Sequence, residues 1–540
     1  MSFRRARRAL FITAAVSVFG LALSACASAG PSDEAAAGGG EVVWAIEGAN
    51  LSDSHMDPHT SQLDVSSMVQ RQILDSLVWQ NADGSFSPWL AKEWTVSEDG
   101  LTYTFTLRDD VTFHDGEKFT AESVKANFDH ISDPKTKSAQ AASMLGGEWY
   151  AGTTVVDENT VEVSFTQPYA PFLSAASTPL LGFYSSAALE AGTEKLKAGA
   201  AGVNIGTGPF VLSEFIPNQE IVYTRNDDYA WGPQGQKAPS IETLRVALVL
   251  ESSVRTGMLN SGEAQIVSDL PPSAVASVDD TATVESKPVA GLPYSLYLNE
   301  KYGVLADQRV REAISIGIDI DTAVDTIFDG QFERAWSILS PSSPGYDASL
   351  ENTWEFDPEA AAALLDEAGW TTLDSEGYRT KDGERLSVRW IAWTPIADEN
   401  KALGVAFQAD LKKIGIELIR EELEPAAYNE QYGPKTFDIT DWGFSGVDSD
   451  LLRNHLHTDG FQNASQVSDP QLDALFEQAI ATSDTEERNA LYTEVQQWNA
   501  ADNAIIPIYV PSLITAVDES IDGLEFDGYG RPLFYDVTLG

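Results

Sequence analysis

Residues 91–131, AKEWTVSEDGLTYTFTLRDDVTFHDGEKFTAESVKANFDHI, contain the pattern that decides the fold. Leu101, Tyr103, Phe105 and Leu107 alternate with three threonines. This alternation predicts a half-buried strand, because successive side chains of a strand point to opposite faces. Asp99-Gly100, just before it, is a turn signal. The stretch therefore predicts a strand that directly follows a tight turn.

The second half of the same stretch predicts a shorter strand and then a helix. Val111 and Phe113 give the strand, which Asp115-Gly116 closes with a turn. Thr120 is suited to cap the helix that follows. Its apolar residues recur at helical spacing and predict one buried stripe, made of Val124, Phe128 and Ile131.

This stretch resembles the signature of the family 5 extracellular solute-binding proteins. These are the oligopeptide-, dipeptide- and nickel-binding components of bacterial ABC importers. The resemblance covers Ala91, Trp94, Asp99-Gly100, the alternating strand, Leu107-Arg108, Phe113-His114-Asp115-Gly116 and Thr120–Val124. A match of this length, with its parts in order, is specific for the family.

Further blocks resemble the same family in chain order, from about residue 41 to 515. They are Gly206–Phe210, Arg225–Tyr229, Ser261–Ile266, Arg309–Ile314, Asp357–Ala360 with Ala368–Trp370, Asp469–Asp473 and Glu487-Arg488. The apolar run Glu41–Ile46, bounded by Gly48, predicts a buried strand at which the folded structure begins. Several of the blocks are helix signals: Asp357 is an N-cap, Pro358 stands at the first helical position and Gly369 ends the helix. Asp469-Pro470 repeats the device. These blocks identify a scaffold rather than a binding site.

The resemblance implies an α/β fold of the type II periplasmic-binding-protein kind. Two lobes are joined by hinge strands, and a subdomain is inserted in the first lobe. On this chain we expect lobe I at 41–68, 200–298 and 505–540, the inserted subdomain at 69–199 and lobe II at 299–504. The solute is held between the lobes, which close by a hinge motion, and the importer's permease recognises the closed form. No bond is made or broken, so we expect no catalytic residue, metal or cofactor.

The N-terminus predicts export and a lipid anchor. Four arginines precede an uncharged run, Ala9–Ala25, as in a signal peptide covering residues 1–25. Leu23-Ser24-Ala25-Cys26 resembles the lipobox of bacterial lipoproteins, which implies that Cys26 becomes a lipidated N-terminus. Residues 26–40 then form this cysteine and a flexible, Gly- and Ala-rich tether. We expect an extracytoplasmic protein held at the cell membrane only by its lipid.

Composition limits the partners. The formal net charge is −48 over 540 residues, which argues against nucleic acid and anionic lipid surfaces. A hydrophobic content of 43% with 13 tryptophans is typical of a globular protein. Cys26 is the only cysteine, so no intrachain disulfide is possible. We expect a monomer that meets a small solute and the permease.

The predicted ligand site is centred on Phe437–Asp448, FDITDWGFSGVD. It resembles the lobe II strand and loop that, in peptide-binding members of the family, carry a tryptophan and then an aspartate for the peptide ammonium. Trp442 matches the tryptophan, whereas Ser445 stands at the aspartate position. A serine cannot neutralise a buried ammonium. Asp441 and Asp448 are the alternatives from a shifted loop, and a core role for Trp442 is the other interpretation.

Three further residues are candidates for ligand contact. Trp393 lies at the end of another predicted lobe II strand, where α/β proteins bind ligands. Tyr297 and Asn299 lie at a predicted interlobe crossing. For each of the three, a purely structural role is the alternative interpretation.

Other functions have weaker signals. Gly443–Val447 nearly matches the G-x-S-x-G motif of hydrolases, but its last position is Val. Metal-chelate binding, known in the family, would need ligands, yet His55, His59, His114, His130, His455 and His457 form no recognisable site and are interpreted as scattered surface residues. An oligosaccharide receptor is the main alternative, since Ser445 suits an uncharged ligand. A structural lipoprotein or a signalling receptor with this fold stays open. A peptide or peptide-like solute is the leading prediction.

Overall fold

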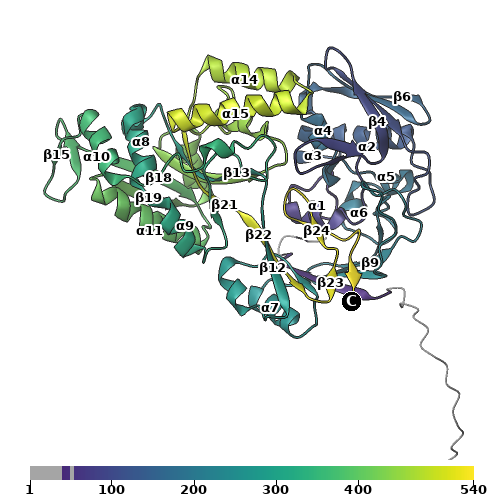
Figure 1. The fold of residues 1–540 in the computed structure, drawn as a ribbon. Helices are drawn as coiled ribbons and strands as arrows, with labels where there is room; N and C mark the ends of the chain where they lie inside the picture. Colours follow the sequence, from purple (N-terminus) through teal and green to yellow (C-terminus); the bar gives the residue numbers. More distant parts are fainter. Residues whose placement is uncertain (1–38, 49–50, 52–53) are drawn as a thin grey trace, which may run out of the picture. The chain divides into compact units, whose positions relative to one another are not determined.

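The computed structural model describes residues 39–48, 51 and 54–540, which belong to one compact unit, Gly38–Gly540 (Figure 1). The predicted signal peptide and Cys26 lie outside the described residues. Helices and mixed sheets alternate along the chain, which confirms the predicted α/β class. Within the described ranges, no helix is both long and apolar enough to cross a membrane.

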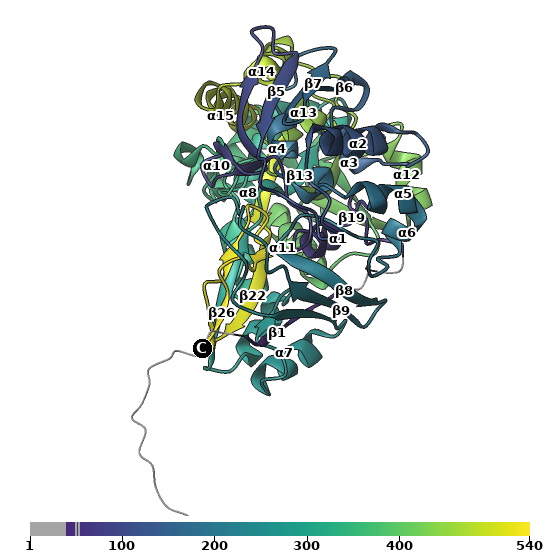
Figure 2. The same ribbon diagram turned by 90° about the vertical axis from the view of Figure 1, so that its right-hand side faces the viewer.

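A seven-stranded sheet is built from distant parts of the sequence. Its order is β12 (Ala282–Pro288), β22 (Ser512–Asp518), β11 (Ile266–Val267), β1 (Glu41–Ile46), β10 (Thr243–Leu248), β9 (Glu220–Arg225) and β8 (Phe210–Ile216). β1 is parallel to β10 and β11, while the other pairs are antiparallel. The helix α7 (Ser252–Asn260) lies against β1 and β11 (Figure 2). Trp44 and Ile46 are fully buried, which confirms the predicted buried strand at 41–46.

The second large sheet has six strands. Its order is β14 (Glu333–Arg334), β21 (Ile505–Val510), β13 (Gly291–Leu298), β20 (Ile439–Ser445), β18 (Ser387–Trp393) and β19 (Glu417–Leu423). One face packs on α8 (Gln308–Gly317), α9 (Ile320–Ile327), α10 (Pro358–Glu367) and α11 (Asp398–Lys413). The other packs on α12 (Pro425–Tyr432), α13 (Leu451–Leu456), α14 (Pro470–Ala481) and α15 (Thr485–Asp502). Both faces are therefore covered by helices.

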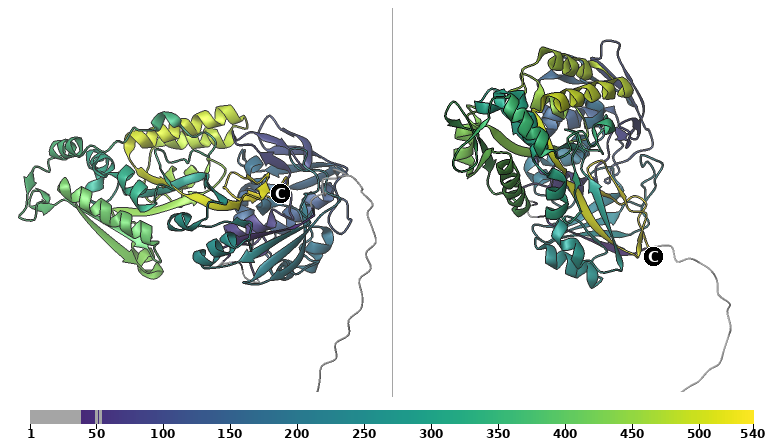
Figure 3. Two further views of the ribbon diagram at one scale, coloured as in Figure 1. Left: turned by 60° about the horizontal axis from the view of Figure 1, so that its bottom comes forward. Right: turned by 60° about the vertical axis from the view of Figure 1, so that its left-hand side comes forward.

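The chain crosses between the two sheets twice. β12 continues into β13, and β21 continues into β22, with only Val289-Ala290 and Pro511 between the paired strands (Figures 1 and 3). The Val289 amide donates to the Pro511 carbonyl at 2.9 Å, which ties the two crossings together. The first change of sheet thus lies several residues before the predicted boundary at 298, and the second lies several residues after the one at 504, because β13 and β21 pair with lobe II strands. The lobe boundaries themselves stay a prediction.

The opening stretch of the sequence belongs to a separate four-stranded antiparallel sheet. Its order is β4 (Ala91–Val96), β5 (Thr102–Leu107), β7 (Thr160–Phe165) and β6 (Tyr150–Asp157). Tyr103, Phe105 and Leu107 are buried, which confirms the period-two prediction. The second predicted strand is wrong, since Val111–Phe113 forms only a single bridge, Thr112 to Lys118. Asp115 and Gly116 turn the chain too soon for a longer ladder.

The predicted helix caps are confirmed. α2 (Ala121–Ser132) begins with a capping box between Thr120 and Ser123, and it buries Val124, Phe128 and Ile131. Asp357 accepts from the amides of Glu359 and Ala360 at the start of α10. Asp469 caps α14 in the same way. Gly369, with φ of +90°, adopts the left-handed conformation just after α10.

The remaining elements are short. The helices are α1 (Asp64–Gln70), α3 (Gln140–Met144), α4 (Phe172–Ala175), α5 (Ser186–Ala191) and α6 (Thr193–Lys197). The strands are β2 (Val78–Gln80), β3 (Phe86–Pro88), β15 (Thr372–Leu373), β16 (Arg379–Lys381), β17 (Glu384–Arg385), β23 (Ile521–Asp522), β24 (Glu525–Phe526), β25 (Pro532–Leu533) and β26 (Thr538–Leu539). The last four belong to a C-terminal loop that covers the crossings, where the Ala290 amide donates to the Gly528 carbonyl at 3.2 Å.

Candidate functional site

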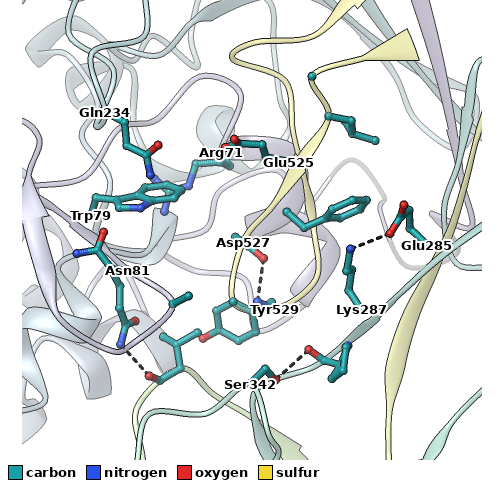
Figure 4. Close-up of a pocket in the computed structure, with 18 of the residues that line it drawn as sticks. Arg71, Trp79, Asn81, Gln234, Glu285, Lys287, Ser342, Glu525, Asp527 and Tyr529 are labelled. Carbon is teal, nitrogen blue, oxygen red and sulfur yellow. Dashed lines mark hydrogen bonds and ion pairs between the residues drawn. The ribbon is translucent and has the colours of Figure 1, made fainter. Parts of the chain in front are cut away.

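A cavity of about 1070 Å³ lies beside the two crossings. Its walls come from five parts of the chain: residues 71–82 with 177–179, Gln234, β12, residues 341–344 with Val447, and the C-terminal loop 517–529. Figure 4 shows Arg71, Trp79 and Gln234 on one side, Glu285 and Lys287 on the other, and Asp527 and Tyr529 between them. Segments attached to both large sheets and to the four-stranded sheet thus enclose one space.

The C-terminal loop is held rigidly over this space. Asp527 Oδ1 accepts from the backbone amides of Tyr529 and Arg531 at 2.9 and 3.0 Å. The Arg531 guanidinium lies 4.0 Å from the centre of the Tyr529 ring and pairs with Asp64 at 2.9 Å. The loop therefore presents the Tyr529 ring to the cavity as a fixed wall.

The two cationic side chains that line the cavity differ in their partners. Lys287 pairs with Glu285 at 2.7 Å, and its ammonium lies 5.0 Å from the Phe526 ring centre. Arg71 is only 7% exposed and lies 5.0 Å from the Trp89 ring centre. Its guanidinium donates to the carbonyls of Leu74 and Ser177 and to the Ser76 hydroxyl. The hydrogen bonds of the Arg71 guanidinium therefore all go to neutral oxygen atoms.

Behind this wall lies Asp75, a buried carboxylate with neutral partners. It accepts from the Thr207 hydroxyl at 3.0 Å, the Trp231 indole at 2.9 Å and the Tyr229 hydroxyl at 3.3 Å. Burial raises the pKa of Asp75 to about 6, although these hydrogen bonds favour the charged form. The network fixes the wall that carries Arg71.

A second set of contacts joins the wall at 71–82 and 170–179 to the six-stranded sheet. Gln80 Nε2 donates to the Val447 carbonyl at 3.0 Å, and the Ser174 hydroxyl donates to Asp448 Oδ2 at 2.7 Å. Asp448 also receives both terminal nitrogens of Arg488, at 2.6 and 2.8 Å. Burial opposes the charge on Asp448, yet Arg488 outweighs this effect and lowers the pKa of that carboxyl. The carboxylate of Asp448, a predicted ligand contact, is thus bonded to other side chains of the protein.

Trp442 and Tyr297 lie together in the core beside α12–α15. Their ring centres are 4.7 Å apart, and Tyr432 packs on Trp442 at 5.4 Å. Tyr297 is fully buried and its hydroxyl lies 3.0 Å from His455 Nδ1. Trp442 is half-buried. Neither residue lines the cavity, so their ligand contact stays a prediction.

The other candidates occupy different surroundings. Trp393, 46% exposed, ends β18 and meets the edge of Tyr428 at 5.2 Å. Ser445 is exposed at the end of β20, two residues before the cavity-lining Val447. Asn299 is fully buried and donates to the carbonyls of Lys435 and Phe437. Trp393 and Ser445 are therefore accessible, while the amide of Asn299 is used by the fold.

The interpretation of the histidines as surface residues is wrong for His59 and His455. They are 0% and 1% exposed, and His59 Nε2 lies 2.8 Å from the Gly182 carbonyl. Burial lowers the pKa of His59 to about 4 and that of His455 to about 3, so both are neutral at pH 7. Across residues 39–48, 51 and 54–540, no three His, Cys, Asp or Glu side chains are placed to hold a metal ion.

Sequence reasoning missed the residues that shape the cavity, above all Arg71 and Tyr529. Arg71 had one local signal, as a lone cation in the buried run from Met68 to Leu77. Tyr529 had no local signal, because its loop reaches the cavity only by folding over the crossings.

Comparisons with known proteins agree with this architecture. The sequence model described as bacterial extracellular solute-binding proteins, family 5 middle, matches residues 85–462. The nickel-binding periplasmic protein of Escherichia coli (strain K12) is 29% identical over 470 residues, 84% of this chain and 86% of that protein. The glutathione-binding protein GsiB of the same strain is 26% identical over 490 residues, 89% of this chain and 91% of that protein.

A solved structure has the same fold. The crystal structure of NikA from Brucella suis in complex with Fe(III)-EDTA superposes with a TM-score of 0.78 and 26% identity. The superposition covers 93% of this chain and 100% of the other. The predicted type II fold with two lobes and hinge strands is confirmed by this likeness together with the observed sheets.

Proposed function

This chain belongs to family 5 of the bacterial extracellular solute-binding proteins, and we propose that it captures a peptide or peptide-like solute for an ABC importer. The cavity beside the crossings is the observation that carries this proposal. Its volume of about 1070 Å³ is that of a site for a small molecule or a short peptide. Its walls come from both large sheets, so a solute bound there contacts both sides of the crossings at once.

Binding at such a place couples capture to closure. A solute that contacts both sides favours the closed arrangement and shifts the population towards it. The two short crossings, Val289-Ala290 and Pro511, are where the backbone can turn as a hinge. The importer's permease then recognises the closed protein. No bond of the solute is made or broken in this cycle.

Peptide-like solutes are favoured by the relatives and by the polarity of the walls. Glutathione, named for one relative, is itself a small peptide. Gln80, Asn81 and Gln234 supply amide donors and acceptors at the cavity, which suit the amide groups of a peptide. We further propose that Trp393 and Ser445 contact solutes that extend beyond the cavity, and that Tyr297, Asn299, Trp442 and Asp448 support the site from within.

A metal chelate is the second candidate, because one relative is named for nickel and the superposed structure holds Fe(III)-EDTA. The described residues hold no cluster of three metal-ligating side chains. In this candidate the chelator, and not the protein, would therefore supply the metal ligands.

We also propose that Cys26 carries the lipid that anchors an otherwise monomeric receptor outside the cell membrane. Two acyl chains on one cysteine give stable membrane attachment. A Cys26→Ala protein is then expected in the soluble fraction, and intact mass should show the diacylglyceryl group only on the unchanged protein.

Native mass spectrometry of the purified protein, before and after unfolding and refolding, tests the solute class. A released compound with peptide bonds, which rebinds and raises the melting temperature, is expected. A hexose ladder or a metal chelate would replace the peptide with that class. A protein that retains no compound, and gains no stability from peptides, chelates or sugars, would contradict the receptor role.

A further inference from the structure

We infer that Arg71 is the subsite for a carboxylate group of the captured solute. The inference rests on the proposed function and specifies the chemistry that the cavity selects. It follows from the way the fold places one buried, permanently charged group on the wall of a large cavity.

Arg71 reaches that wall from a rigid base. It directly follows α1 (Asp64–Gln70), and its guanidinium lies 5.0 Å from the centre of the buried Trp89 ring. Nη1 donates to the Leu74 carbonyl and the Ser76 hydroxyl, while Nη2 donates to the Ser177 carbonyl at 2.6 Å. These bonds fix the plane of the guanidinium. They engage Nη1 and one hydrogen of Nη2.

The Nε donor of the guanidinium has no such partner. It makes no hydrogen bond with the described residues, and Nη2 makes only the one to Ser177. These two donors form one edge of the arginine fork, which matches the two oxygens of a carboxylate. Arg71 lines the cavity (Figure 4), and its unbonded Nε keeps some exposed surface, so this donor is open to a solute.

The charge of Arg71 also lacks a counterion. Among residues 39–48, 51 and 54–540, no carboxylate oxygen lies within 4.0 Å of its nitrogens. Asp75 and Asp527 act on it from further away, and both carboxylates already accept bonds from other groups. Burial lowers the pKa of the Arg71 guanidinium, but arginine stays charged at any physiological pH. A buried cation without a counterion is costly, so an anion entering the cavity is stabilised there.

The second cation of the cavity does not compete for this anion. Lys287 already pairs with Glu285 at 2.7 Å. The C-terminal wall adds Glu519, Asp522, Glu525 and Asp527, which repel an anion. A solute carboxylate is therefore directed to Arg71, and any positive group of the same solute to the acidic wall. A peptide with a free C-terminus and a metal chelate with carboxylate arms both carry the required group.

The test uses the purified full-length protein and one mixture of probes. The mixture holds trialanine, trialanine amide, glutathione, Fe(III)-EDTA and maltotriose, and mass spectrometry identifies what the protein retains. We expect retention of free carboxylates and not of the amide or the sugar. Trialanine or glutathione as the retained probe identifies a peptide source of the carboxylate, and Fe(III)-EDTA identifies a chelate.

Three variants then locate the subsite. Arg71→Gln should raise the Kd of the retained probe about 100-fold, since it removes the buried cation. Arg71→Lys keeps the charge without the fork and should raise it less. Arg255→Gln is the matched control, because Arg255 is equally buried and donates to three carbonyls away from the cavity. It should leave the Kd unchanged.

The outcomes separate the two claims. Equal retention of trialanine and its amide, retention of maltotriose alone, or an unchanged Kd in Arg71→Gln would overturn the carboxylate subsite and leave the receptor role intact. Retention of no probe at all would overturn the receptor role, and the subsite with it. The comparison of acid with amide uses the unchanged protein, so it holds even if a variant fails to fold.

Discussion

Arg488 and Arg71 each lie near an aspartate, but the two regions arrange their charges differently: Arg488 and Asp448 are half-buried, while Arg71 and Asp75 are buried. Arg488 meets Asp448 through two bonds of 2.6 and 2.8 Å. Arg71 and Asp75 are instead kept apart, each surrounded by neutral hydrogen-bonding groups. The first region joins α15 to the loop after β20, and the second forms the wall of the cavity. A paired arginine serves the fold, whereas an unpaired one at a cavity is available to a ligand.

The largest effect is expected where the pair is complete. Arg488→Met leaves the half-buried Asp448 with only the Ser174 hydroxyl and backbone for partners, so we expect a loss of about 3 kcal/mol in the free energy of unfolding. Urea denaturation measures this loss. The double variant Arg488→Met with Asp448→Asn should recover part of it, because no unpaired charge remains. A loss below about 1 kcal/mol for the single variant would contradict the view that Arg488, unlike Arg71, serves to stabilise the fold.

The two aspartates should respond to pH with opposite sign. Burial raises the pKa of Asp75 to about 6, so between pH 4 and 6 the folded state keeps a proton that the unfolded state has lost. The contribution of Asp75 to the free energy of unfolding therefore falls as pH rises through this range. Relative to the unchanged protein, Asp75→Asn should therefore gain about 2 kcal/mol between pH 4 and pH 8. Denaturation of both proteins at four pH values measures the difference, in which the other titrating groups cancel.

Asp448 provides the opposite case. Its pKa is lowered, so its contribution is present above the pKa of the unfolded chain and is lost as pH falls through the folded value. Asp448→Asn should thus become relatively less unfavourable in acid. A difference for Asp75→Asn that does not change with pH would show that its carboxyl titrates normally.

The smallest effect is expected at the edge of the paired region. Ser174→Ala removes one hydrogen bond to Asp448 while Arg488 still holds the carboxylate, so we expect a loss of about 1.5 kcal/mol. Ser132→Ala, whose exposed hydroxyl bonds only its own helix, is the control and should cost less than about 0.5 kcal/mol. Equal losses for both variants would show that the Ser174 contact adds nothing to stability.

Local patterns predicted the scaffold because they are written in neighbouring residues. The alternation from Leu101 to Leu107 and the capping residues Thr120 and Asp357 each determine a few residues of backbone, and the structure has them as predicted. The strand predicted at Val111–Phe113 did not form beyond a single bridge, because a pattern of three residues cannot outweigh the turn that follows it.

The cavity could not be predicted in the same way. Arg71 and Tyr529 are far apart in the sequence and meet only through the crossings. The histidines misled because polarity alone suggests exposure, while His455 lies beneath the buried Tyr297 ring. The pattern around Trp442 pointed to β20, none of whose residues lines the cavity; Val447, two residues beyond the end of that strand, does.

The two crossings also fix the order in which this protein can be completed. β22 lies between β12 and β11, and β21 lies between β14 and β13, so both large sheets have an interior place that only residues 505–518 can fill. Until residues 505–518 take these places, β12 is separated from β11, and β14 from β13. The four-stranded sheet, made entirely of residues 91–165, has no such wait. The cavity, whose walls include residues 517–529, is therefore completed only after β21 and β22 have entered their sheets.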